Sequence, residues 1–92
     1  MTTQTTIIKT EQYEIRKVKM NGIKPSECKK EKEYLCISLE GVDMDVSTKA
    51  EDGEYTITLQ GVSEHMIRQA NSSGMIHFPK RYFSHDMLIV QI

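Results

Sequence analysis

The chain has 92 residues, of which 27% are charged and 38% hydrophobic, and its net charge is −1. This length suits one small domain, and because so short a chain buries a modest part of its surface, dimerisation would help it. No apolar run approaches the roughly 20 residues that cross a membrane, and residues 1–6 lack the basic and apolar parts of a secretory signal. We therefore expect a cytoplasmic protein that does not enter a membrane.

Alternation of apolar and polar residues at period two dominates the chain, and no window shows an apolar stripe at helical spacing. The sequence predicts a mainly β protein with little helix, built as a small β-meander, sandwich or barrel. Strands are expected at residues 5–9, 13–20, 33–39, 42–46, 55–60, 65–70, 74–78 and 86–92.

Turn residues punctuate these strands. Asp52-Gly53 is the strongest hairpin signal, Glu40-Gly41 predicts a hairpin over residues 34–48, and Asn21-Gly22 predicts another turn. Residues 25–33 are expected to form a loop, or a short surface helix that begins at Ser26. The chain then divides into an acidic β-rich region over 1–61 and a segment over 62–92, with one single domain as the alternative.

The segment from Ser72 to Tyr82 joins a turn, a short strand and a proline-basic stop. It resembles the swapped-hairpin AbrB/MazE-like DNA-binding family, which includes short archaeal transposon-encoded proteins and carries a pattern like Gly-Asn-Ser-Gly-Arg-Val-Tyr-Leu-Pro-Lys-x-Trp. Met75 stands where the family usually has arginine. Identical or similar residues at the motif positions include Ser73, Gly74, Ile76, Phe78, Pro79, Lys80 and Tyr82.

The resemblance implies a homodimer that binds DNA and acts as a transcription regulator or an antitoxin-like factor. Residues 65–92 carry a net charge of +2, whereas residues 1–64 carry −3. Cationic side chains that would contact DNA phosphates are Arg68, Lys80 and Arg81, joined by Arg16, Lys17 and Lys19 if their strand lies on the same side.

Two other functions remain open. Asp43 and Asp45 alternate with apolar residues and predict an exposed acidic strand face. Such a face, with edge strands able to extend a partner sheet, suits a viral or mobile-element interaction module that binds a host protein. The chain could also serve only as a dimeric scaffold.

Catalytic and metal-binding patterns are weak in this sequence. It has no glycine-rich phosphate loop, and Cys28 and Cys36 do not form a CxxC pair. We therefore expect no enzyme, no cofactor and no metal, with Cys36 packed as a small hydrophobe and Cys28 exposed.

Overall fold

The protein is described by a computed structural model over residues 4–26 and 32–92. It is mainly β, with two antiparallel sheets and one short 3-10 helix, η1 (Lys80–Tyr82). The three-stranded sheet has the order β1 (Thr5–Thr10), β5 (Tyr55–Gln60) and β4 (Asp43–Val46). The four-stranded sheet has the order β2 (Glu14–Lys17), β7 (Asp86–Gln91), β3 (Glu33–Ser38) and β6 (His65–Gln69).

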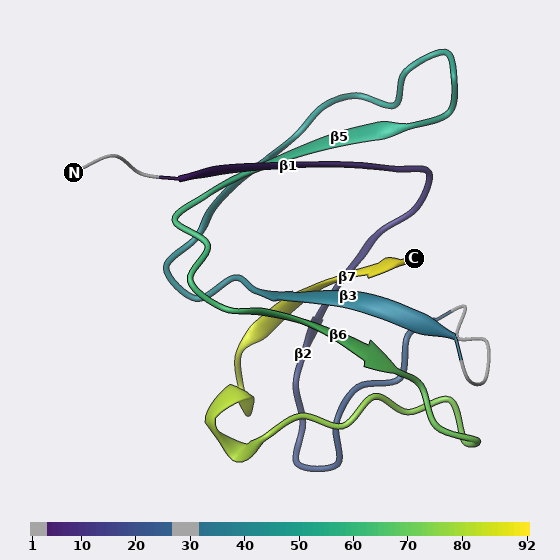
Figure 1. The fold of residues 1–92 in the computed structure, drawn as a ribbon, viewed down its shortest axis with the longest axis vertical. Helices are drawn as coiled ribbons and strands as arrows, with labels where there is room; N and C mark the ends of the chain where they lie inside the picture. Colours follow the sequence, from purple (N-terminus) through teal and green to yellow (C-terminus); the bar gives the residue numbers. More distant parts are fainter. Residues whose placement is uncertain (1–3, 27–31) are drawn as a thin grey trace.

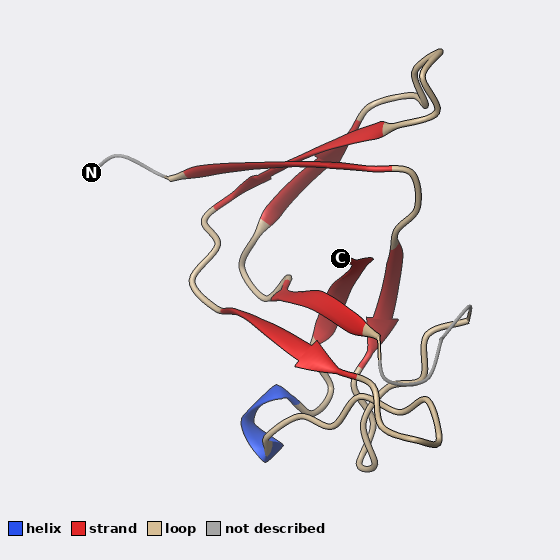
Figure 2. Ribbon diagram, turned by 45° about the vertical axis from the view of Figure 1, so that its right-hand side comes forward, coloured by secondary structure: helices blue, strands red, loops and turns tan. Residues whose placement is uncertain are grey.

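The two sheets face each other and do not close into a barrel, as Figures 1 and 2 show. The sandwich alternative is therefore confirmed, and the barrel alternative is wrong. Apolar side chains from both sheets fill the space between them. This inter-sheet core consists of Ile37, Ile57, Leu59, Leu88 and Val90, with partly buried neighbours at its rim.

The opposite face of the four-stranded sheet is also covered. Two connecting segments, residues 18–26 and 70–85, lie over it and form what we call the loop layer, at the bottom of Figures 1 and 2. The second core under this layer, the loop-side core, contains Val18, Ile23, Tyr34, Cys36, Ala70, Ile76, Phe78, Tyr82, Met87 and Ile89.

Strand β7 explains why both cores form on one sheet. Met87 and Ile89 point into the loop-side core, whereas Leu88 and Val90 point into the inter-sheet core. A strand that is buried on both faces needs a continuous apolar run, and all four residues are buried.

Most of the predicted strands are present, but the expected hairpin over residues 34–48 is wrong. β3 and β4 belong to different sheets, because the turn at Glu40-Gly41 carries the chain from one sheet to the other. Leu39 and Val42 flank this turn, pack against the inter-sheet core and share a backbone hydrogen bond of 3.1 Å. The Asp52-Gly53 hairpin is confirmed, since β4 pairs with β5.

The expected strand at residues 74–78 is also wrong. Within this stretch only Ile76 forms a bridge, to Ile23, and the chain otherwise follows an irregular path. β6 and β7 do not pair with each other but lie on either side of β3. The boundary expected at residue 61 therefore separates strands that share one sheet, and the resemblance to the swapped-hairpin family stays a prediction.

Two sequence expectations concern residues outside this description. The loop or short helix expected to begin at Ser26 runs into residues 27–31, and the exposure expected for Cys28 falls in the same range, which lies outside the described residues.

No helix in the described parts of the chain is long and apolar enough to span a membrane.

Candidate nucleic-acid interface

The loop layer is tied together by one close backbone pair. The Ile23 N–H donates to the Ile76 carbonyl at 2.9 Å, and the Ile76 N–H donates to the Ile23 carbonyl at 2.8 Å. Both isoleucine side chains are buried in the loop-side core, so the two loops are joined by backbone and side chain together.

Gly22 makes this pairing possible. Its φ is +99°, and a Cβ atom built on it would lie 2.2 Å from the carbonyl oxygen of Ile76. Any other residue would therefore meet backbone and also adopt a left-handed conformation that L-residues avoid. The Asn21-Gly22 turn expected from the sequence is thus held against the second loop.

An open groove lies where this turn meets strand β2. Its lining side chains are mostly cationic, and no acidic residue lines it among the described residues. The lining consists of Arg16, Lys17, Lys19, Gly22, Ile23, Lys24 and Met75. We call this feature the basic groove.

Arg16 is fixed within the basic groove by a small polar network. Its Nε donates to Glu14 Oε1 at 2.7 Å, and its Nη2 donates to Ser26 Oγ. Ser26 in turn donates to Glu14 through its hydroxyl at 2.6 Å and its backbone N–H at 2.9 Å. This network joins β2 to the end of the first loop.

The same network controls the charge of Glu14. Partial burial opposes ionisation of this carboxyl, but the hydrogen bonds from Ser26 and Arg16, with the positive charge of Arg16, outweigh it. The pKa of Glu14 is therefore lowered from 4.5, and the carboxylate stays ionised at neutral pH. Arg16 is a positioning residue rather than an unengaged cation.

The three lysines of the basic groove form fewer polar contacts with other described residues than Arg16 does. Lys19 and Lys24 are exposed and form no ion pair with any described residue. Lys17 lies 4.0 Å from Asp86, but both side chains are more than half exposed, and such a surface pair is weak. These ammonium groups are available to an anionic ligand.

The basic groove is not lined by Arg68, Lys80 or Arg81, the cations expected from the resemblance. Arg68 lies on β6, at the edge of the four-stranded sheet opposite β2. Arg81 lies over the ring of Tyr82 at 4.8 Å, donates to its hydroxyl at 2.9 Å and stands 3.9 Å from Glu64. Lys80 is exposed in η1.

The motif residues serve the fold of the loop layer. Pro79 precedes η1, and Tyr82 is buried at 2% exposure. Ser73 and Gly74 form a turn with Asn71, in which the Gly74 N–H donates to the Asn71 carbonyl at 2.9 Å.

Asn71 organises the turn that leads to Met75. Its Oδ1 accepts the backbone N–H of Ser73 at 2.9 Å and that of Met75 at 3.0 Å. Because Oδ1 accepts these two bonds, the amide nitrogen Nδ2 is the atom that lies 3.1 Å from His77 Nε2. An amide N–H₂ group can only donate, so the imidazole nitrogen accepts. Asn71 thereby orients Met75, which lines the basic groove; an Asn three residues before Gly is the sequence pattern that marks it.

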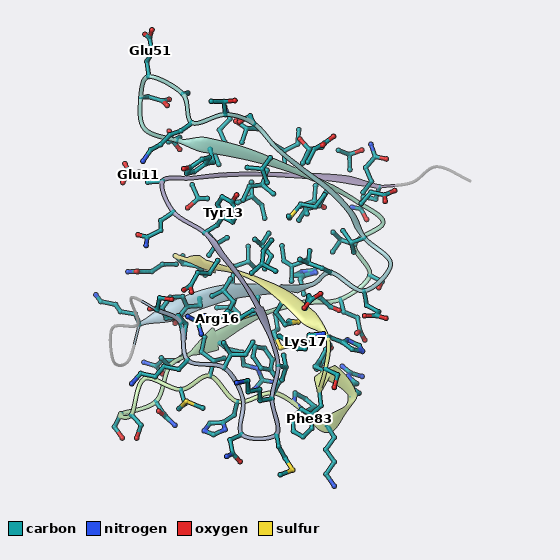
Figure 3. The ribbon with its side chains drawn as sticks, turned by 180° about the vertical axis from the view of Figure 1, so that it is seen from behind. Glu11, Tyr13, Arg16, Lys17, Glu51 and Phe83 are labelled. Carbon is teal, nitrogen blue, oxygen red and sulfur yellow. The ribbon has the colours of Figure 1, made fainter. Side chains whose placement is uncertain are left out.

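Charge is divided between the two sheets more sharply than along the chain. The acidic half, residues 4–12 and 40–61, holds two Lys and seven Asp or Glu, for a net charge of −5. The basic half, residues 13–26, 32–39 and 62–92, holds eight Lys or Arg and four Asp or Glu, for +4. Figure 3 shows Glu11 and Glu51 beside the three-stranded sheet, and Arg16 and Lys17 beside the other.

Asp43 and Asp45 lie where the interaction-module hypothesis expects them. Both are exposed on the outer face of β4, an edge strand, and lie opposite Gln60 and Thr58 of β5. They belong to the three-stranded sheet, whereas the basic residues of β2 belong to the four-stranded sheet.

Other reactive groups are structural in the described parts of the chain. Cys36 is fully buried, and burial raises the pKa of its thiol to about 12, with the positive charge of Arg68 opposing that shift. The thiol is therefore protonated and unreactive, as expected of a packed cysteine. No three His, Cys, Asp or Glu residues within 4–26 and 32–92 are placed to hold a metal ion.

Comparison with family models, curated proteins and solved structures gives no match to this chain.

Proposed function

We propose that this chain is a small DNA-binding protein, of the transcription-regulator or antitoxin-like kind, that holds the phosphate backbone in its basic groove. The observation that carries the proposal is the groove itself, with four cationic side chains and no acidic lining residue among those described. Lysine ammonium groups contact phosphates as point charges and release condensed counterions, which is the main source of sequence-independent affinity for DNA.

The groove supports backbone contact rather than base reading. Lys17, Lys19 and Lys24 have ammonium groups to offer, whereas Arg16 is held by Glu14 and Ser26. A binding site with about three phosphate contacts gives a slope of roughly −3 in log affinity against log salt. In a homodimer the same groove is present twice, and the slope doubles.

The experiment is fluorescence anisotropy of a labelled mixed-sequence duplex over a range of salt concentrations. The test variant is Lys19→Ala with Lys24→Ala. We expect its salt slope to fall by about 2 for each groove, and its affinity to fall roughly tenfold to a hundredfold at moderate salt.

The matched control is Lys32→Ala with Lys49→Ala, which removes the same charge from exposed positions outside the basic groove and should leave the affinity nearly unchanged. A third variant, Lys80→Ala with Arg81→Ala, tests the residues of the resembled motif. If only this variant weakens binding, the site lies at η1 and not in the groove. Absence of binding by the unmodified protein at low salt would refute the DNA proposal.

A second candidate function rests on the outer face of the acidic half. Asp43 and Asp45 are exposed on an edge strand, in the half of the molecule whose net charge is −5. This negative charge is complementary to a basic surface on a host protein. A labelled oligolysine peptide is the probe. Asp43→Lys with Asp45→Lys should abolish its low-salt binding, whereas Glu51→Lys with Asp52→Lys, at the distant hairpin tip, should weaken it less. Equal losses in both variants would show general attraction and no site at β4.

A further inference from the structure

The four edge strands of the two sheets differ in how they are protected against pairing with another chain. β2 and β4 have four residues each, and each carries at least two charged side chains. β6 has five residues and carries Arg68 and His65. β1 has six residues, Thr5 to Thr10, with Lys9 as its only charged side chain. Long, weakly charged edges rich in threonine and isoleucine readily add a further strand.

The backbone of β1 has one row of groups that point away from the sheet. The Gly61 N–H donates to the Gln4 carbonyl at 3.3 Å, which identifies residues 4 and 61 as a hydrogen-bonded pair. Because such pairs alternate along an antiparallel ladder, Thr6, Ile8 and Thr10 direct their backbone groups to β5. The N–H and C=O groups of Thr5, Ile7 and Lys9 therefore lie on the outer edge.

The side chains of the same three residues lie on the outer face of the sheet and are exposed. Ile7 is the conspicuous one, because 61% of it is exposed on a face whose neighbours on β5 are Thr56, Thr58 and Gln60. An apolar side chain at the centre of an unpaired edge is suited to contact its own copy across a two-fold axis.

We propose that β1 pairs antiparallel with β1 of a second copy of this chain, about a two-fold axis at Ile7. Ile7 then lies opposite Ile7 of the second copy, and each Thr5 lies opposite a Lys9. The two three-stranded sheets become one continuous six-stranded sheet with β4 at both ends. This pairing does not depend on the DNA-binding proposal, since its residues belong to the acidic half.

The other registers fit less well. An axis at Lys9 places two lysines directly opposite each other, which is unfavourable. An axis at Ile8 places Ile7 beside Lys9 of the second copy and leaves the exposed isoleucines without an apolar partner. An axis at Thr5 uses little of the strand. The Ile7 register buries the exposed apolar residue and separates the like charges.

The test is sedimentation velocity of the full chain over a range of concentrations. Because a single pair of six-residue strands buries little surface compared with a standard interface, we expect a concentration-dependent dimer. Ile7→Glu places two carboxylates face to face and should give a monomer at every concentration, as should Ile7→Lys. An equimolar mixture of the two variants should restore the dimer through an opposite-charge pair.

The control is Thr58→Glu, which adds the same charge to the same face but on the central strand β5, and should still dimerise. Circular dichroism of each variant separates loss of pairing from loss of fold. A wild-type chain that stays monomeric at its highest attainable concentration overturns the proposal, as does an Ile7→Glu variant that remains dimeric. A tighter dimer for Ile7→Glu would indicate pairing with Lys9, and therefore the Ile8 register instead.

Discussion

The two sheets of this protein are built by the same alternation of residues but are covered differently. The three-stranded sheet has one face on the inter-sheet core, and its other face is exposed and polar apart from Ile7. The central strands β7 and β3 of the four-stranded sheet are buried on both faces, because the loop layer covers the side that the first sheet does not. Irregular loops therefore pack here as a third layer, and they carry four of the eight cations that the basic half holds.

This division also separates the two proposals. The basic groove belongs to the loop-covered half and depends on the contact between the two loops. The β1 edge belongs to the exposed sheet and depends only on strand order and register. A substitution confined to the β1 edge should therefore leave the structure of each basic groove intact, and a substitution in the loop layer should leave the β1 edge in place.

The largest expected effect is the loss of the loop layer in Gly22→Ala. The new Cβ meets the Ile76 carbonyl and the backbone must hold a left-handed conformation, which together cost about 3 to 4 kcal/mol. Chemical unfolding measures the total, and amide exchange should rise first in residues 18–26 and 70–85.

Gly53→Ala is the matched control for this prediction. Gly53 also has a positive φ, +85°, but its nearest neighbour is a flexible lysine end at 3.9 Å. We expect a cost of only about 1 to 2 kcal/mol, from the backbone conformation alone. Equal costs for the two variants would mean that the two loops are not in contact at Gly22.

Substitutions at two neighbouring residues of β7 compare how much each core contributes to stability. Met87→Ala opens a cavity in the loop-side core and Leu88→Ala opens one in the inter-sheet core, and each should cost about 3 kcal/mol. Since both residues belong to one strand, we expect a single unfolding transition in denaturant for both variants. A separate early transition in Met87→Ala would show that the loop layer unfolds independently of the sandwich.

The smallest expected effect concerns pH and the anchor of Arg16. The pKa of Glu14 is lowered by folding, so its contribution is complete above the unfolded value of 4.5 and is lost as pH falls through the lower folded value. Glu14→Gln should therefore cost about 1 kcal/mol at neutral pH and nearly nothing in strong acid.

Urea unfolding at neutral pH and well below pH 4.5 measures this difference. Glu11→Gln removes the same charge from an exposed position and should show little change at either pH. If Glu14→Gln instead lowers the free energy of unfolding equally at both pH values, the shape of the side chain, and not its negative charge, holds Ser26 and Arg16.

Local sequence predicted much of the fold because strand alternation and turn chemistry act over a few residues. The Asp52-Gly53 hairpin, the strand at residues 33–38 and the apolar run of β7 are examples. The strand expected at residues 74–78 was wrong because Ile76 and Phe78 alternate as in a strand but belong to the loop layer, from which both side chains pack into the loop-side core.

The candidate site was predicted only in part. Arg16, Lys17 and Lys19 were named on the condition that their strand lay beside the motif, and Lys24, Gly22 and Met75 were missed as lining residues. No local pattern marks them, since they meet through the backbone pair of Ile23 and Ile76, more than fifty residues apart in the chain.

Local sequence patterns were enough to predict a mainly β chain, the positions of most strands, the Asp52-Gly53 hairpin and the packing of Cys36 in a core. The strand order, with β3 between β7 and β6 and β1 at an edge, and the division of charge between the two sheets became known from the three-dimensional structure. The physical reason is that alternation specifies which face of a strand is buried, whereas the choice of partner strand depends on long-range packing that no short segment encodes.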